Sequence, residues 1–564
     1  MRKQSIARMA VTAGLALTMA LGPVAAPVAA FAADGASTSG STSSSTTTDA
    51  TTGTGSITIN TNKNLTTDST TLSGYQIFKA DVADKTVGGV TTKAVSNIEW
   101  ASDAVQTAVV SSINAVDSTY TDTSAQAAAT WLSGHASSSG SSTVVAATDA
   151  FGRIASALRT SGVEPTTVTP GTAATLETGY WLFVTNATTT NEKVNQVGTA
   201  PIYAVVGGSA VTVNQKSNLP TVNKYIKNDK INSSWGKYAD SEIGQSLDYK
   251  LTGTIADAYA SYKSYYYSFY DTFDSGITLD EDSVTVKVQT PASDDTAQTE
   301  TTVAATSYTE TYENNALTVT INDLKSVKDE DGNPISVTPD SVVTVYYTAH
   351  LNENAKVASS HNDNEVTLTY SNNPGTDSKG TTEQDKVRDY TYQLMLMKVD
   401  ASNSTALPGA KFTIQATGAD EGAGTNYVQS DGSLGDTAYE FTTGTDGGIY
   451  VPGLDAGTYT VVETQAPSGY NKAATFTFTI LPVYDTATGD ITNLTASTNN
   501  QNVATSGVSK ENVIQLTVKD NAGIALPLTG QAGVTITWIA GGAVLALGIT
   551  HLVRSRKNAE DSAE

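Results

Sequence analysis

Three polar side chains in the middle of the chain fall at strand positions whose in-phase neighbours are apolar. They are Lys224, between Val222 and Ile226 in phase, Asp271, between Phe269 and Phe273, and Asn372, which continues the phase of Val366, Leu368 and Tyr370. Because alternate residues of a strand point to the same face, all three are expected to face an apolar core. The same alternation places Asp248 outward, so Asp271 is preferred as the buried acid.

A lysine, an acid and an asparagine in one core carry a large desolvation penalty unless they pair or react. Burial disfavours the ammonium form and leaves a neutral amine that can act as a nucleophile. Burial also raises the pKa of the carboxyl group, so a protonated Asp271 can polarise the Asn372 carbonyl and shuttle protons. The expected product is an isopeptide bond between Lys224 and Asn372, formed with loss of ammonia. The alternative is an ordinary solvated lysine and a turn asparagine.

The surrounding segments resemble those of isopeptide-forming pilin domains. The resemblance rests on Pro220-Thr221-Val222-Asn223-Lys224 and on Tyr370-Ser371-Asn372-Asn373-Pro374. Residues 217–388 contain period-2 strands separated by turn signals. This stretch is therefore expected to form an antiparallel β-sandwich.

A second reactive set is expected in residues 389–523. Strand alternation places Lys398 with Leu396, Glu463 with Val461, and Asp520 with Val518. The run Tyr392-Gln393-Leu394-Met395-Leu396-Met397-Lys398-Val399-Asp400 and the later run Gly457-Thr458-Tyr459-Thr460-Val461-Val462-Glu463-Thr464-Gln465-Ala466-Pro467 resemble a collagen-adhesin B-type (prealbumin-like) domain with its E-box.

That resemblance implies a role for each residue of the second set. Lys398 would be the nucleophile, Glu463 the proton shuttle and Asp520 the acceptor, with loss of water. The family usually carries asparagine at the acceptor position, so Asp520 is a departure, and Asn521 is the alternative acceptor.

The C-terminal segment, residues 524–564, combines three features. They are the pentapeptide Leu526-Pro527-Leu528-Thr529-Gly530, an apolar run without charged side chains over about residues 533–553, and the basic residues Arg554, Arg556 and Lys557. A helix over that run would be about 30 Å long, the thickness of a bilayer's hydrocarbon core. The combination resembles a Gram-positive LPxTG sorting signal, which implies that a sortase cleaves between Thr529 and Gly530 and joins Thr529 to an amine. A permanent membrane span is the alternative.

The N-terminus indicates export. Residues 1–33 have the basic start, apolar stretch and small-residue cleavage site of a secretory signal peptide. Residues 34–55 are dominated by Ser and Thr, and they are expected to form a flexible leader because they lack apolar surface to bury. The expected location is outside the cell, covalently attached to the cell wall as part of a fimbria, after a transient membrane anchor.

Residues 56–216 are expected to form a mixed α/β domain. Ser102 and Asp149 are predicted N-caps of two helices. The segments Tyr75-Gln76-Ile77-Phe78 and Gly179-Tyr180-Trp181-Leu182-Phe183 resemble the N-terminal domain of sortase-assembled backbone pilins of the SpaA/FimA type.

The same resemblance singles out Lys216. Those pilins end this domain with Tyr-Pro-Lys, whose lysine attacks the sortase acyl-enzyme of the next subunit. Here Asn214 and Gln215 precede Lys216, which departs from the motif. The alternatives are that Lys227 or Lys230 serves instead, or that Lys216 is an ordinary solvated lysine.

Composition excludes several classes of function. Lys and Arg number 32 against 56 Asp and Glu, a net charge of −24 that argues against nucleic acid as a partner. The chain has no Cys, so its extracellular stability cannot come from disulfides. The four His are scattered, and neither a metal site, a cofactor nor a turnover enzyme is expected.

The predicted fold is mainly β, with tandem immunoglobulin-like (Cna-type) antiparallel β-sandwiches after the α/β pilin domain. The predicted function is a structural backbone subunit of a covalently polymerised pilus that serves adhesion. The expected partners are pilin-specific and housekeeping sortases, other copies of the chain, minor pilins, peptidoglycan and an unidentified host receptor. The alternative is a monomeric wall-anchored adhesin or a minor tip or base pilin.

Overall fold

The structure is a computed structural model. It describes residues 45–523 apart from positions 64, 66–69, 88–89, 137–143, 188–192, 228–233, 292–297, 358–359, 418–425, 487 and 509–510. The predicted signal peptide, the first half of the leader and the LPxTG segment with its apolar run lie outside this range. In the described part of the chain, no helix is both long and apolar enough to cross a membrane.

The described residues form two compact units, and the fold is mainly β, as predicted. The first unit extends to Thr391 and includes Thr486–Gly489. The second contains Tyr392–Asp485 and the described residues from Asp490 onward.

The first unit begins with two sheets and a set of helices. One sheet has the order β1-β3-β7-β9, with β4 and β5 also paired to β3, and the other has the order β10-β2-β6. Their bounds are β1 Ser45–Thr47, β2 Thr54–Ile59, β3 Leu72–Val87, β4 Val90–Trp100, β5 Thr166–Val168, β6 Ala173–Glu177, β7 Gly179–Thr185, β9 Ile202–Val206 and β10 Val211–Val213, and the helices are α1 Asp103–Asn114, α2 Ala125–His135 and α3 Ala150–Thr160.

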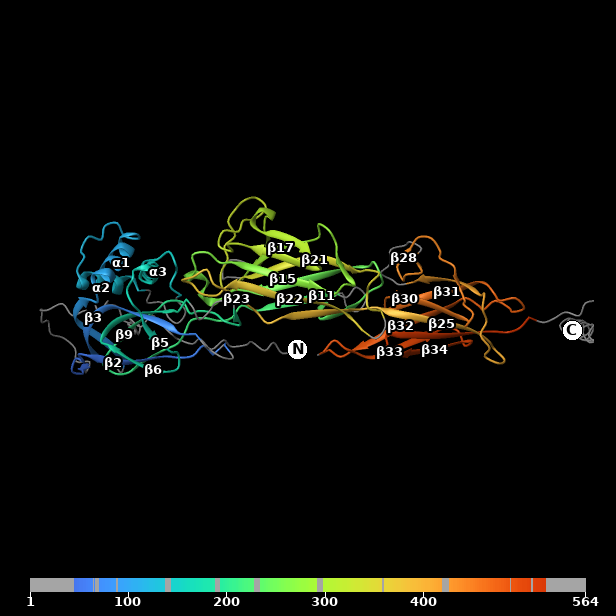
Figure 1. The fold of residues 1–564 in the computed structure, drawn as a ribbon, viewed down its shortest axis with the longest axis horizontal. Coiled ribbons are helices and arrows are strands. Elements are labelled where there is room, and N and C mark those ends of the chain that lie inside the picture. The colour runs from blue at the N-terminus through green and yellow to red at the C-terminus, as the bar shows by residue number, and fades with distance from the viewer. Residues whose placement is uncertain are drawn as a thin grey trace, which may run out of the picture. The chain divides into compact units, whose positions relative to one another are not determined.

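Different elements pack on the two faces of the larger sheet. Residues of the helices pack on one face, where Leu182 and Tyr203 contact the core that contains Ile154 (Figure 1). The alternate residues, including Phe183, join a second core with Ile57 of β2. The predicted N-caps Ser102 and Asp149 are confirmed, because each side chain accepts a hydrogen bond from the backbone N–H three residues later, and Ser124 caps α2 in the same way.

The end of the leader differs from the sequence prediction. Ser45–Thr47 forms β1, which pairs antiparallel with β3, and Thr51 forms a bridge to Val82. The composition of this segment gave no sign of the pairing, because an edge strand binds through backbone N–H and C=O groups and needs no apolar side chains.

The rest of the first unit is built on two facing sheets. One has the order β12-β11-β14-β21-β17-β18, with β16 on β21, and the other has the order β13-β24-β22-β15-β20-β19, with β23 between β22 and β8. The bounds are β8 Lys193–Val194, β11 Val222–Lys227, β12 Trp235–Gly236, β13 Tyr238–Asp240, β14 Ser246–Thr254, β15 Tyr267–Phe273, β16 Ile277–Leu279, β17 Thr285–Thr290, β18 Thr299–Thr302, β19 Thr309–Glu313, β20 Ala316–Ile321, β21 Val342–Leu351, β22 Asn362–Ser371, β23 Lys379–Thr381 and β24 Asp385–Tyr390, with short 3₁₀ helices at Asp257–Ser261 and Ala305–Ser307.

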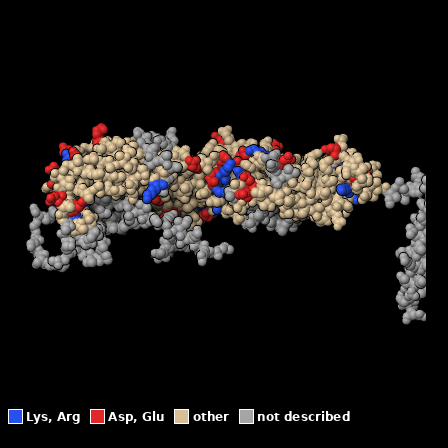
Figure 2. All heavy atoms as spheres, turned by 90° about the horizontal axis from the view of Figure 1, so that it is seen from below, with Lys and Arg blue, Asp and Glu red and all other residues tan. Residues whose placement is uncertain are grey.

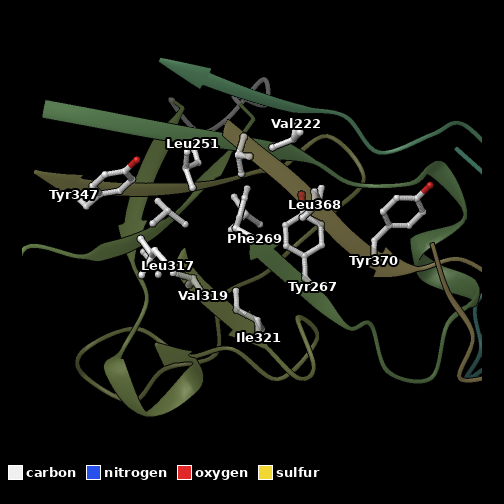
Figure 3. Packing of buried hydrophobic residues seen from close by; sticks show 14 of the residues in the cluster. Val222, Leu251, Tyr267, Phe269, Leu317, Val319, Ile321, Tyr347, Leu368 and Tyr370 are labelled. Atoms are coloured by element: carbon white, nitrogen blue, oxygen red, sulfur yellow. The ribbon is translucent and has the colours of Figure 1, made fainter. Parts of the chain in front are cut away.

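The inward-pointing side chains of alternate strand residues fill the space between these sheets. The burial of β11 and β14 alternates strictly, and their buried apolar residues join one core with those of β15, β20, β21 and β22. Figure 3 shows this packing, with Tyr347 and Tyr370 toward opposite ends of the cluster. The predicted antiparallel character holds for the ladder of β11, β14 and β21.

The second unit also has two sheets, with orders β30-β25-β35-β34 and β28-β27-β26-β31-β32-β33, and β29 pairs with β26. The bounds are β25 Tyr392–Asp400, β26 Lys411–Ala416, β27 Tyr427–Val428, β28 Leu434–Gly435, β29 Phe441–Thr442, β30 Gly448–Leu454, β31 Gly457–Gln465, β32 Phe476–Tyr484, β33 Ile491–Thr498, β34 Val503–Val508 and β35 Val513–Asp520. The first strand, β25, lies parallel to the last described strand, β35, with Lys398 opposite Val518 and Asp400 opposite Asp520.

Candidate functional site

Three strands of the second unit bring Lys398, Glu463 and Asp520 together. The Lys398 Nζ contacts Asp520 Oδ1, and it lies 3.3 Å from Glu463 Oε1 and 3.4 Å from Oε2. The side chains of Lys398 and Glu463 are fully buried and that of Asp520 is 1% exposed. Asp520 reaches the amine because it stands two residues beyond Val518, the register partner of Lys398, on the same face of the sheet.

The surroundings favour proton sharing in this cluster. Burial raises the pKa of Glu463, and the neighbouring Asp520 raises it further, while Lys398 and a hydrogen bond from the Ala473 backbone N–H oppose the shift. Burial also raises the pKa of Asp520. Two buried carboxyl groups facing one amine therefore favour a state in which one carboxyl is protonated. A protonated carboxyl group beside a lysine amine is the arrangement that amide formation requires.

The alternative acceptor Asn521 lies outside this cluster. Its side chain is exposed, and its backbone carbonyl accepts a hydrogen bond from the Asn471 N–H. Of the two candidate acceptors, Asp520 is the one whose side chain contacts the Lys398 amine.

A second cluster lies in the core of the first unit. The Lys224 Nζ is 2.5 Å and 2.6 Å from the two carboxylate oxygens of Asp271, and it donates to the hydroxyl of Tyr347 at 2.7 Å. The side chains of Lys224 and Asp271 have no exposed surface. Burial lowers the pKa of Lys224 to about 8 despite the opposing charge of Asp271, and burial raises the pKa of Asp271.

The asparagine in this cluster is Asn364, and the predicted Asn372 is elsewhere. The Nδ2 of Asn364 donates to the Tyr347 hydroxyl at 2.8 Å. Asn372 accepts a hydrogen bond from Ser378 Oγ at 2.7 Å and stands eight residues further along the same strand direction, about 26 Å at 3.3 Å per residue. The assignment of Asn372 as the partner of Lys224 is therefore wrong.

The error has a physical cause. Asn364 lies in β22 and Asn372 follows directly after that strand at a position of the same phase. Both are buried, so alternation cannot separate them. The register separates them, because Asn364 pairs with Phe273, two residues from Asp271 on the adjacent strand. The signal available in the sequence was the phase shared by Asn364, Val366 and Leu368, which admits Asn364 as readily as Asn372.

Asp248 and the candidate polymerisation lysines that the structure describes lie outside the two buried clusters. Asp248 points outward and forms an ion pair of 3.0 Å with Lys227, in agreement with its predicted direction. Lys216 lies between β10 and β11, is half-buried, and its backbone N–H donates to Thr199 Oγ1 at 2.9 Å. Burial lowers the pKa of the Lys216 amine, which favours its nucleophilic form. Lys230 and residues 526–530 lie outside the described residues.

The described residues contain no group of three or more His, Cys, Asp or Glu side chains arranged to hold a metal ion. Figure 2 shows small, mixed groups of acidic and basic side chains on the face in view, separated by uncharged surface.

Comparison with known proteins assigns part of the second unit to a family. Residues 392–495 match the family model described as SpaA, prealbumin-like fold domain. This stretch, which contains Lys398 and Glu463, is similar to a SpaA-type prealbumin-like domain. No match was found among the curated proteins.

Several solved structures are also similar. The backbone protein of the group B streptococcus pilus 2b is 24% identical, covering 54% of this chain and 98% of that one, with a TM-score of 0.36. The T6 backbone pilin of serotype M6 Streptococcus pyogenes is 16% identical, covering 84% of this chain and 99% of that one, with a TM-score of 0.47. The major pilin SpaD of Corynebacterium diphtheriae is 16% identical, covering 64% and 86%, with a TM-score of 0.39.

Proposed function

We propose that this chain is a backbone subunit of a surface pilus whose subunits and domains are joined by amide bonds through lysine side chains. The observation that carries the proposal is the buried cluster of Lys398, Glu463 and Asp520. Lys398 and Asp520 lie on the neighbouring strands β25 and β35, and Glu463 lies on β31 of the other sheet, in a unit that is similar to a SpaA-type domain. Burying one amine against two carboxyl groups is costly unless the groups react.

The proposed reaction in the second unit is a condensation. The Lys398 amine attacks the carboxyl carbon of a protonated Asp520, a nitrogen–carbon bond forms, and the carbon–hydroxyl bond breaks. Glu463 takes a proton from the nitrogen and returns it to the departing hydroxyl, which leaves as water. No cofactor is needed, because electrons and protons balance within the three side chains.

The corresponding reaction in the first unit joins Lys224 to Asn364. Lys224 lies on a strand of one sheet and Asn364 on a strand of the other, so the bond would tie the two sheets together. Asp271 would hold the proton that the amine gives up. The leaving group is ammonia, since the acceptor is an amide.

Between subunits, a sortase would join Thr529 of one copy to the Lys216 amine of the next, and the last subunit would be attached to peptidoglycan. The LPxTG-like segment supports this proposal, together with the half-buried position of Lys216 and its lowered pKa. The departure of Asn214 and Gln215 from Tyr-Pro favours a second candidate, a monomeric wall-anchored adhesin or a minor pilin.

The test is made on the bacterial surface. Wall material is released enzymatically, boiled in detergent and probed for this chain. A backbone pilin gives a ladder of high-mass species, and digestion of the ladder gives a peptide in which Lys216 is joined to Thr529. Single chains of unmodified mass would reject polymerisation and support the adhesin.

A further inference from the structure

The hydroxyl of Tyr347 is hydrogen-bonded to each of the other three residues of the Lys224 cluster. It donates to Asp271 Oδ2 at 2.7 Å, accepts from Lys224 Nζ at 2.7 Å and accepts from Asn364 Nδ2 at 2.8 Å. A phenolic hydroxyl has one proton to donate and two lone pairs, so its hydrogen-bonding capacity is fully used. These three partners are the acid, the nucleophile and the leaving nitrogen of the proposed Lys224–Asn364 reaction.

We propose that Tyr347 is a catalytic residue of isopeptide formation in the first unit, and that its hydroxyl carries the proton that lets ammonia leave. The inference rests on the proposed function, because it needs the Lys224–Asn364 reaction to occur. It extends that function by adding a fourth participant to the lysine, acid and asparagine.

The proton balance shows where Tyr347 is needed. The Lys224 ammonium first gives a proton to Asp271, which leaves a neutral amine. The nitrogen lone pair attacks the Asn364 amide carbon, and the carbonyl electrons move to its oxygen. The new nitrogen–carbon bond then leaves one proton too many on Nζ and one too few on Nδ2.

Tyr347 contacts both of those nitrogens and can correct the imbalance in one relay. Its hydroxyl gives its proton to Nδ2 and takes a proton from Nζ. The carbon–Nδ2 bond breaks, the carbonyl reforms, and ammonia departs. Tyr347 ends as it began, a neutral phenol, and Asp271 keeps the first proton.

The burial of Tyr347 suits this role. Burial raises the pKa of Tyr347 well above its ordinary value, so the hydroxyl stays protonated and able to donate. Asp271 has no hydrogen bond to Asn364 among the described contacts, and Tyr347 bridges the two. The Oδ1 of Asn364 is buried without a hydrogen-bond partner in the described structure.

The neighbouring Tyr249 supplies a matched control. Its ring stacks on the Tyr347 ring with centroids 5.1 Å apart and planes 3° apart, and both side chains are buried. The Tyr249 hydroxyl makes no hydrogen bond in the described structure. Removing either hydroxyl deletes one buried oxygen from the same stack, but only the Tyr347 oxygen touches reacting atoms.

The experiment follows bond formation in the full-length chain. The wild type, Tyr347→Phe, Tyr249→Phe and Asp271→Ala are produced by cell-free translation with detergent and sampled over time. Each sample is digested, and the peptide that joins Lys224 to Asn364 with loss of ammonia is quantified by mass spectrometry. We expect Tyr347→Phe to slow formation by about 10²-fold, the lower end for a positioned proton transfer. Tyr249→Phe should stay near the wild-type rate, and Asp271→Ala should give no bond.

Folding of the variant is checked separately. Before its bond has formed, Tyr347→Phe should melt close to Asn364→Ala, which cannot form the bond but keeps the hydroxyl. If Tyr347→Phe does not fold, difluorotyrosine placed at position 347 keeps the ring and the oxygen while making the phenol more acidic. A changed rate supports the relay, and an unchanged rate overturns it.

The remaining outcomes are distinct. Bond formation in Tyr347→Phe at the wild-type rate overturns the inference while leaving the Lys224–Asn364 reaction intact. Absence of the cross-linked peptide from the wild type overturns the reaction itself, and the role of Tyr347 with it.

Discussion

Asn364 and Asn372 lie in phase along one strand direction, both fully buried, and only Asn364 is hydrogen-bonded to the cluster that holds Lys224. Eight residues of extended chain separate them, about 26 Å. Position along the strand, rather than the direction of the side chain, therefore decides which asparagine can react.

Replacing each asparagine tests that relationship. Asn364→Ala should abolish the Lys224 cross-link, and the chain mass should rise by the ammonia that is no longer lost, after correction for the substitution. Asn372→Ala should retain the cross-link, because its partner is Ser378. Intact-mass measurement of both variants is sufficient, and a bond that survives in Asn364→Ala but not in Asn372→Ala would restore the sequence-based assignment.

Glu463→Gln should block the condensation in the second unit while preserving its packing. The intact mass should rise by about one water, since Lys398 and Asp520 stay unjoined. Closing a loop of more than 100 residues adds about 4–5 kcal/mol by the chain-entropy account of cross-links, so thermal unfolding of the second unit should shift strongly downward.

The matched control for that variant is Lys411→Ala. Lys411 forms an ion pair of 2.7 Å with Glu440 in the same unit, but both side chains are more than a third exposed. Such surface pairs contribute about 0–1 kcal/mol. A comparable loss of stability in both variants would argue against a covalent bond at Lys398.

Formation of the Lys224 bond should depend on pH in a bell-shaped manner. The reactive state shares one proton between Lys224 and Asp271. Below the raised pKa of Asp271 the pair holds two protons and the amine is blocked. Above the Lys224 pKa of about 8 Asp271 is ionised without the Lys224 proton, and its carboxylate keeps the hydrogen bond from the Tyr347 hydroxyl, which withholds that proton from Asn364 Nδ2. The two apparent pKa values seen in the rate profile belong to the Lys224–Asp271 pair and not to either residue alone.

The measurement uses chain recovered unfolded from inclusion bodies and diluted into buffers from about pH 5 to 10, with the cross-linked peptide quantified over time. Above pH 8 the rate should fall roughly tenfold per pH unit, as expected for loss of one proton. A rate that keeps rising to pH 10 would mean that no acid takes part.

Lys216→Ala should abolish the high-mass ladder, since it removes the proposed polymerisation amine. Lys227→Ala is the control, because Lys227 lies nearby and is occupied in an ion pair with Asp248. The measurement is immunoblotting of detergent-boiled wall extracts from cells that express the sortase. Loss of the ladder only in Lys227→Ala would move the amine to that residue.

Strand alternation alone predicted much of the two clusters. It predicted that five polar side chains point inward, and all five are buried in the structure. They are Lys224, Asp271, Lys398, Glu463 and Asp520. It failed at Asn372, because a period of two residues carries no information on register between strands.

The role of Tyr347 was also beyond the sequence. Alternation along β21 places it in the core among valines, where a tyrosine is an ordinary packing residue. Its hydroxyl becomes significant only when strands from both sheets bring Lys224, Asp271 and Asn364 to it. The pairing of Ser45–Thr47 escaped prediction for a similar reason, since backbone groups alone make it.

The parallel arrangement of β25 and β35 has a mechanical consequence. A pull applied at Tyr392 and at the residues after Asp520 would enter and leave through two adjacent strands. With Lys398 and Asp520 covalently joined, the force would cross directly between them, and residues 399–519 would bear none of it. The domain could not lengthen by unravelling, and a thread of such units would transmit tension almost without stretching.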